Sequence, residues 1–125
     1  MLRTNLKHIQ DEADFQETLS KHENVMACCG RMGPMCLPVY DVMEKVEPKY
    51  SHVAFRDLEF DGPFGHLIRN LPEVRNFNGL PFTVYFKNGK PVAATTSIQT
   101  KKQVTEILDR QFGSPQGQPA YSKQA

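Results

Sequence analysis

The chain has 125 residues, of which 23% are charged, and a formal net charge of +1 at pH 7. That length is typical of one domain with a core of its own, and the near-neutral charge gives no electrostatic argument for binding nucleic acid or an acidic membrane surface. No apolar run approaches the roughly 20 residues of a membrane span, and the N-terminus lacks the apolar segment of a secretory signal. A cytoplasmic protein is therefore expected.

The first elements expected along the chain are a strand, a helix and a second strand. Residues 6–9 alternate apolar and polar side chains, as a short edge strand does. Residues 11–21 follow helical periodicity, with Asp11 as the expected N-cap. Residues 24–29 are a compact apolar run, too short for an independent helix and typical of a strand buried on both faces.

A second helix is expected to begin at Gly33-Pro34, because a proline in the first turn loses no hydrogen bond. Pro38 lies one turn further on and should either bend this helix or mark its regular start. An apolar stripe with helical spacing follows, and Pro48 ends the helix. The next strand is expected over residues 52–57, and the acidic residues from Asp57 to Asp61 are interpreted as its solvated end.

The second half of the chain is expected to contain a hairpin and a final helix. Residues 82–86 carry the strongest strand signal, because aromatic and β-branched side chains dominate them. Asn88-Gly89 supplies the two φ > 0 positions of a tight turn, after which residues 92–96 return antiparallel. The other expected features are helical segments at residues 66–71 and 73–77, a helix capped by Thr100 and ended by Gly113, and a disordered tail over residues 114–125.

The expected order is therefore β-α-β-α-β-α-β-β-α. Strands that are separated by helices pair in parallel through crossover connections, whereas the closing hairpin adds an antiparallel pair. We expect an α/β fold in which a mixed central sheet lies between two layers of helices, as a three-layer α/β/α sandwich. A single domain should cover residues 1–113.

All three cysteines lie within nine residues, at Cys28, Cys29 and Cys36. In a reducing compartment such a cluster favours catalytic, redox-sensing or metal-binding roles over a structural disulfide framework. A helix N-terminus and a nearby cation, Arg31, both favour a thiolate. Cys29 is therefore the candidate nucleophile and Cys36 the candidate resolving thiol, with Cys28 as a third thiol.

Two other interpretations of these residues stay open. The three cysteines and Met26, Met32 and Met35 place six soft sulfurs in eleven positions, which suits Cu(I), and three thiolates with His52 or His66 would suit zinc. No Cys-x2-Cys pair is present, however, and neither a metal nor a cofactor is assigned. Alternatively, the cysteines are small buried hydrophobes and the methionines fill gaps, which is the favoured interpretation of Cys28 and Met26.

The order of elements resembles thioredoxin over about residues 5–112. The most specific match is Gly79-Leu80-Pro81, followed by the strand over residues 82–86 and the Lys-Asn-Gly hairpin. A second match is the strand-Cys-Gly…Gly-Pro-helix junction over residues 25–38. The resemblance implies a cis bond before Pro81 and a groove, shaped by Leu80, Pro81, Gly30 and Arg31, where the chain of a partner docks.

The site departs from the Trp-Cys-Gly-Pro-Cys of that family. Cys28 stands where the tryptophan would be. Either Cys29 matches the first cysteine, with Cys36 seven positions later, or Met32-Gly33-Pro34-Met35 matches Cys-Gly-Pro-Cys and both cysteines have become methionine. The strand before the site also offers no counterpart to the family's buried acid.

The resemblance implies a thiol–disulfide oxidoreductase that acts in cell redox homeostasis. Its substrate would be a protein disulfide, a reductase would recycle it, and it would work as a monomer. The alternative is a non-catalytic binding module on the same scaffold, either a Cu(I)-binding protein or a redox-inert adaptor.

Overall fold

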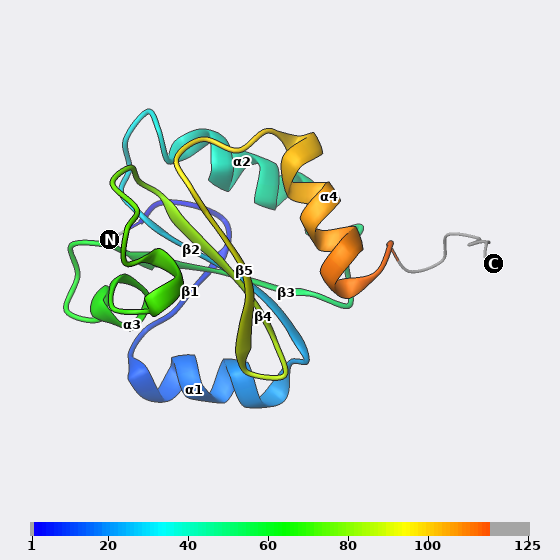
Figure 1. The fold of residues 1–125 in the computed structure, drawn as a ribbon, viewed down its shortest axis with the longest axis horizontal. Coiled ribbons are helices and arrows are strands. Elements are labelled where there is room, and N and C mark those ends of the chain that lie inside the picture. Colours follow the sequence, from blue (N-terminus) through cyan, green and yellow to red (C-terminus); the bar gives the residue numbers. More distant parts are fainter. Residues whose placement is uncertain (1, 116–125) are drawn as a thin grey trace.

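The structure is a computed structural model that describes residues 2–115, so most of the predicted tail lies outside the described residues. A five-stranded sheet lies between two layers of helices (Figure 1). The elements are β1 (Lys7–His8), α1 (Glu12–Lys21), β2 (Asn24–Gly30), α2 (Leu37–Val46), β3 (Ala54–Glu59), α3 (His66–Arg69), the 3₁₀ turn η1 (Pro72–Val74), β4 (Phe82–Lys87), β5 (Lys90–Thr96) and α4 (Lys101–Phe112).

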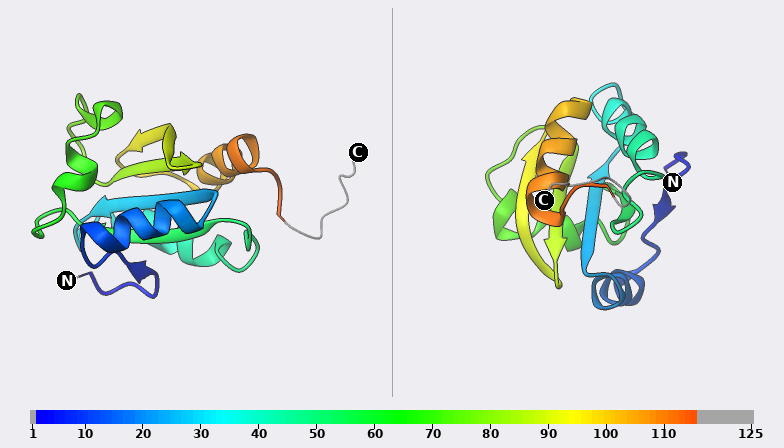
Figure 2. Two further views of the ribbon diagram at one scale, coloured as in Figure 1. Left: turned by 90° about the horizontal axis from the view of Figure 1, so that it is seen from below. Right: turned by 90° about the vertical axis from the view of Figure 1, so that its right-hand side faces the viewer.

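The sheet has the strand order β1-β3-β2-β4-β5. β1, β3 and β2 are parallel, β4 is antiparallel to β2, and β5 is antiparallel to β4. Helices α2 and α4 cover one face, and α1 and α3 lie on the other (Figures 1 and 2). The predicted mixed sheet and the three-layer α/β/α architecture are therefore confirmed. Within the described part of the chain, no helix has the length and apolar character needed to cross a bilayer.

Strand β2 is the centre of both cores, because all of its seven residues are buried. Alternate side chains of a strand point to opposite faces of the sheet. Met26 and Cys28 accordingly pack with α2 and α4, whereas Ala27 and Cys29 pack with α1 and α3. The prediction of a strand buried on both faces is confirmed, and adjacent cysteines lie in different cores.

Local sequence explains the ends of several elements. Asp11 caps α1 by accepting a hydrogen bond from the Asp14 N–H, and Thr100 forms a capping box with Gln103 at the start of α4. Asn88 and Gly89 have φ angles of 52° and 82°, as the tight hairpin turn between β4 and β5 requires. These predictions are confirmed.

The start of α2 differs from the prediction. Residues 33–36 form a turn instead, in which the N–H groups of Cys36 and Leu37 both donate to the Gly33 carbonyl, at 3.1 and 3.0 Å. The helix begins at Leu37, so Pro38 occupies its first turn and marks its regular start. Because Pro34 is equally compatible with a turn and with a first helical turn, the sequence pattern did not separate the two.

Candidate thiol site

Cys36 lies at the N-terminus of helix α2, where it is the N-cap residue. Its Sγ accepts a hydrogen bond from the Arg31 backbone N–H at 3.3 Å. The first turn of a helix also has unpaired N–H groups and a partial positive charge, both of which favour an anionic sulfur. Only 2% of the residue is exposed, so the sulfur is buried.

Residues from several elements of the fold meet around Gly30. A Cβ atom at this position would lie 2.7 Å from Tyr40 Oη, 2.9 Å from Cys36 Sγ and 3.0 Å from Pro81 Cβ. The Leu80–Pro81 peptide bond is cis. Three of the predicted site residues, Gly30, Cys36 and Pro81, are thus brought together, and Tyr40 joins them without having been predicted.

Cys28 and Cys29 point to opposite faces of the sheet. Cys28 belongs to the same core as Cys36, and the Thr83 hydroxyl lies 3.7 Å from its Sγ. Cys29 belongs to the opposite core, where its Sγ lies 4.0 Å from the Gly65 carbonyl oxygen. The structure therefore does not bring the predicted pair Cys29 and Cys36 to one face; the thiol that shares a face with Cys36 is Cys28.

Both cysteines of β2 are thiols with a strong preference for the protonated form. Burial raises the pKa of Cys29 to about 12, although the nearby Arg69 cation lowers it in part. Burial also raises the pKa of Cys28 well above its usual range, against a smaller lowering by the Thr83 hydrogen bond. None of the three cysteines is in a disulfide. The surroundings of Cys29 therefore favour its thiol over the expected thiolate.

Arg31 donates its backbone N–H to the thiol, and its guanidinium is paired elsewhere. Its guanidinium forms two hydrogen bonds with the exposed Asp61 carboxylate, at 2.6 and 3.0 Å. The same group lies 5.2 Å from the centre of the Phe60 ring, within cation–π range. The pairing with Asp61 thus holds the Arg31 side chain at the start of the 31–35 turn.

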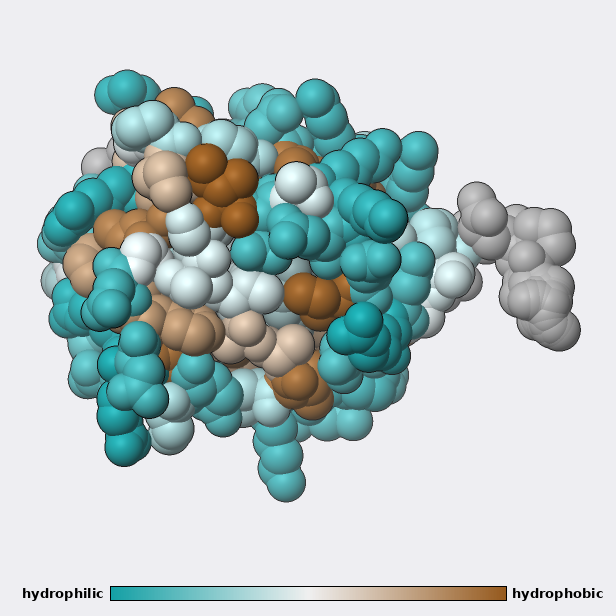
Figure 3. Space-filling view, turned by 45° about the horizontal axis from the view of Figure 1, so that its top comes forward, coloured by the Kyte–Doolittle hydropathy of each residue, from teal (hydrophilic) through white to brown (hydrophobic). Residues whose placement is uncertain are grey.

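The surface around the thiol exposes apolar side chains. Met35 and Leu37 are 45% and 44% exposed on the turn and at the start of α2. Leu80 and Met32 are half-buried, and Met32 Sδ accepts a hydrogen bond from the Arg3 backbone N–H at 3.3 Å. On the α2 and α4 side, apolar patches interrupt a largely hydrophilic surface (Figure 3). An exposed thioether and an exposed leucine therefore border the site.

Asp57 is a buried acid, so its interpretation as part of a solvated strand end is wrong. It is fully buried on β3, directly opposite Cys28 in the sheet. The Thr4 hydroxyl donates to Asp57 Oδ2, and His8 Nδ1 lies 2.5 Å from Oδ1. Burial raises the pKa of Asp57, although both hydrogen bonds oppose this. Both partners come from the N-terminal segment, about 50 residues away, which sequence pattern could not reveal.

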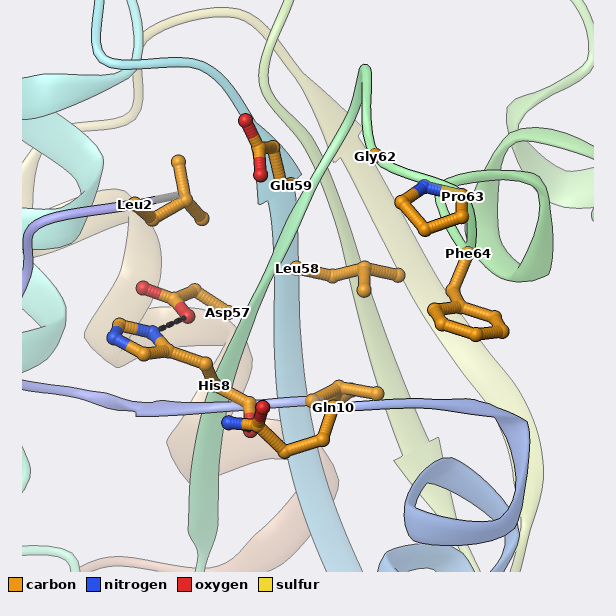
Figure 4. A pocket seen from close by; sticks show the side chains of 10 residues that line it. Leu2, His8, Gln10, Asp57, Leu58, Glu59, Gly62, Pro63 and Phe64 are labelled. Atoms are coloured by element: carbon orange, nitrogen blue, oxygen red, sulfur yellow. Dashed lines mark hydrogen bonds and ion pairs between the residues drawn. The ribbon is translucent and has the colours of Figure 1, made fainter.

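A cavity of about 160 Å³ opens beside this acid at the β1–β3 edge (Figure 4). His8, Asp57, Leu58 and Phe64 are among its lining residues, and no cysteine lines it. The cavity is therefore separate from the thiol site. Over residues 2–115, no three His, Cys, Asp or Glu side chains are grouped as a metal site.

No protein-family model and no curated protein sequence matches the chain. Solved structures do. A thioredoxin variant from Halobacterium salinarum superposes with a TM-score of 0.72 at 16% identity, over 95% of this chain and 100% of that one. Thioredoxin f2 of Chlamydomonas reinhardtii gives 0.71 at 14% identity, over 87% and 98%. Plasmodium falciparum thioredoxin gives 0.68 at 16% identity, over 85% and 99%. The fold is thioredoxin-like.

Proposed function

We propose that the chain is a thioredoxin-like thiol–disulfide oxidoreductase and that Cys36, in place of Cys29, is the thiol that reacts first. The observation that carries this proposal is the hydrogen bond from the Arg31 N–H to Cys36 Sγ at the N-cap of α2. A thiol attacks a disulfide as the thiolate, and a backbone donor at a helix N-terminus favours that form. Pro81 lies against the same point above Gly30.

Cys28 is the proposed resolving thiol, since it shares a core with Cys36. The Cys36 thiolate attacks one sulfur of a substrate disulfide and forms a mixed disulfide, while the other substrate sulfur leaves as a thiolate and takes a proton from water. Cys28 then attacks Cys36 Sγ, and its proton passes to the departing substrate sulfur. This forms a Cys28–Cys36 disulfide and releases the second substrate sulfur as a thiol. A reductase then returns two electrons and two protons to the protein.

The proposed substrate is a protein disulfide, docked along Leu80 and Pro81 as the thioredoxin resemblance implies. The exposed side chains of Met35 and Leu37 suit an apolar stretch of such a partner. Cys36 is 2% exposed, so the substrate reaches it only when the turn over residues 31–35 moves aside. The protein would act as a monomer in a reducing compartment such as the cytoplasm, where its three thiols stay reduced.

Insulin disulfide reduction with single cysteine variants tests the proposal. Cys36→Ser should abolish turnover, Cys28→Ser should trap a mixed disulfide at Cys36, and Cys29→Ser should keep the wild-type rate. Mass spectrometry of the oxidised protein should map a Cys28–Cys36 bridge. Full turnover by Cys36→Ser would overturn the proposal, whereas loss of turnover in Cys29→Ser with a Cys29–Cys36 bridge would restore Cys29 as the nucleophile.

A binding module without redox activity is the second candidate, and the burial of all three thiols favours it. Each cysteine is at most 2% exposed, whereas the Met35 thioether is 45% exposed. In this case the site would hold a partner, or Cu(I) through the sulfurs of Met32, Met35 and Cys36. Anaerobic Cu(I) titration against a competing chelator distinguishes a Cu(I)-binding protein from a module that binds only a protein partner. Binding of Cu(I) should be present in the first case alone, and it should be lost in Cys36→Ser and Met35→Leu.

A further inference from the structure

Tyr40 carries a buried hydroxyl that lacks a hydrogen-bond partner among the described residues. The side chain is 2% exposed, in the core shared by Cys28 and Cys36. A buried polar group without a partner is uncommon in native proteins, because it has lost its bonds to water and gained none in return. Such a group calls for a functional explanation.

The geometry directs this hydroxyl toward the thiol. Tyr40 lies four residues after Cys36, on the same side of the first turn of α2, and helical side chains lean toward the N-terminus. Tyr40 Oη and Cys36 Sγ lie 2.7 and 2.9 Å from one point, the place of an absent Cβ above Gly30. Since that point is empty only because residue 30 is glycine, the phenol oxygen and the sulfur border the same small space, where no hydrogen bond joins them in the structure.

We propose that the Tyr40 hydroxyl donates a hydrogen bond to the Cys36 thiolate and holds it against Pro81 for attack. This inference rests on the proposed redox function and deepens it. Tyr40 is then a positioning residue, and the Arg31 N–H is the second donor to the same sulfur. The thiolate would then accept hydrogen bonds from both groups, and the Tyr40 hydroxyl would gain the partner that it otherwise lacks.

The groups around the phenol fit a donor role. Burial raises the pKa of Tyr40 far above its usual value, and nearby Cys28, Cys36 and Asp57 raise it further, so the hydroxyl keeps its proton. These three groups, from β2, the N-cap of α2 and β3, together with Cys29 behind the sheet, are all neutral or anionic. Arg31 is paired with Asp61. The two hydrogen-bond donors proposed for a thiolate at this place, the Arg31 N–H and the Tyr40 hydroxyl, are therefore both neutral.

Tyr40→Phe tests the inference, because it removes only the oxygen. The readout is the rate at which iodoacetamide alkylates Cys36 as a function of pH, followed by mass spectrometry of the Cys36 peptide. At pH 7 the rate should fall about tenfold or more, and the pH profile should move to higher pH. The control is Tyr85→Phe, which removes the other buried tyrosine hydroxyl without a described partner and should leave the rate within about twofold.

Stability separates this role from a structural one. Removing a buried donor without a partner should leave the urea midpoint unchanged or raise it, so a slower thiol in an equally stable variant supports the inference. An unchanged pH profile in Tyr40→Phe overturns it. If Cys36→Ser still abolishes insulin reduction in that case, the proposed function stands; full turnover by Cys36→Ser would instead remove the proposed function itself.

Discussion

Gly30→Ala should destabilise the fold and disable the thiol at once. The added methyl group would lie 2.7 Å from Tyr40 Oη, 2.9 Å from Cys36 Sγ and 3.0 Å from Pro81 Cβ. Distances below 3.0 Å are not tolerated by a carbon atom, so the phenol and the sulfur must both move. Overpacking of a buried site by one methyl group costs about 1–3 kcal/mol. All three neighbours are buried, and we expect the upper half of that range.

Urea denaturation measures this cost, and Gly33→Ala is the matched control. A Cβ atom at Gly33 meets no atom within 4 Å, and its φ angle is not positive. Alanine there should therefore be neutral or stabilise by up to about 1 kcal/mol, through the unfolded chain. Gly30→Ala should also lose most of its insulin reduction while Gly33→Ala keeps it. A Gly30→Ala protein within about 0.5 kcal/mol of wild type would refute the packing described for the site.

The buried Cys29 thiol and the buried Asp57 carboxyl group, both on the sheet, should make the stability of the fold depend on pH. The unfolded Cys29 thiol ionises near pH 8.5 and the folded one at about 12, so wild-type stability should fall relative to Cys29→Ala as pH rises from 8.5 to 10, by up to about 1.4 kcal/mol per unit. If the free energies of unfolding of the two proteins, measured with urea, changed equally between pH 8.5 and 10, the prediction would be wrong. Burial raises the pKa of Asp57, so the wild type should lose stability relative to Asp57→Asn as pH rises from about 4. A difference that is constant from pH 4 to 7 would show that Asp57 ionises as freely as in the unfolded chain.

The elements that carry strong local patterns were predicted correctly from the sequence. β4 and its hairpin combine aromatic residues with Asn88-Gly89, and both turn residues have the expected positive φ angles. Thr100 and Asp11 occupy their expected cap positions. Each of these features depends on residues within a few positions of one another, which is the range over which propensity and capping act.

The candidate site could be predicted only in part, because it depends on which way side chains face. Alternation along β2 requires Cys28 and Cys29 to point apart, but it does not say which of them shares a core with Cys36. The start of α2 at Leu37 decides where Cys36 points, and the prediction placed that start four residues too early. Asp57 is buried by residues of the N-terminal segment, which lie far away in sequence.

The neighbours of Cys28 across the sheet favour the proposed order of reaction, in which Cys36 reacts before Cys28. Asp57, Cys28 and Thr83 are direct neighbours on β3, β2 and β4 and point to one face. Cys28 thus lies between a carboxyl group and a hydroxyl, deep in the core, where burial holds its proton. Cys36 lies at a helix N-terminus with a backbone donor on its sulfur. In the proposed mechanism the thiol with a backbone donor on its sulfur, Cys36, attacks first. Cys28, whose pKa is raised by burial, is proposed to react second, with the mixed disulfide at Cys36.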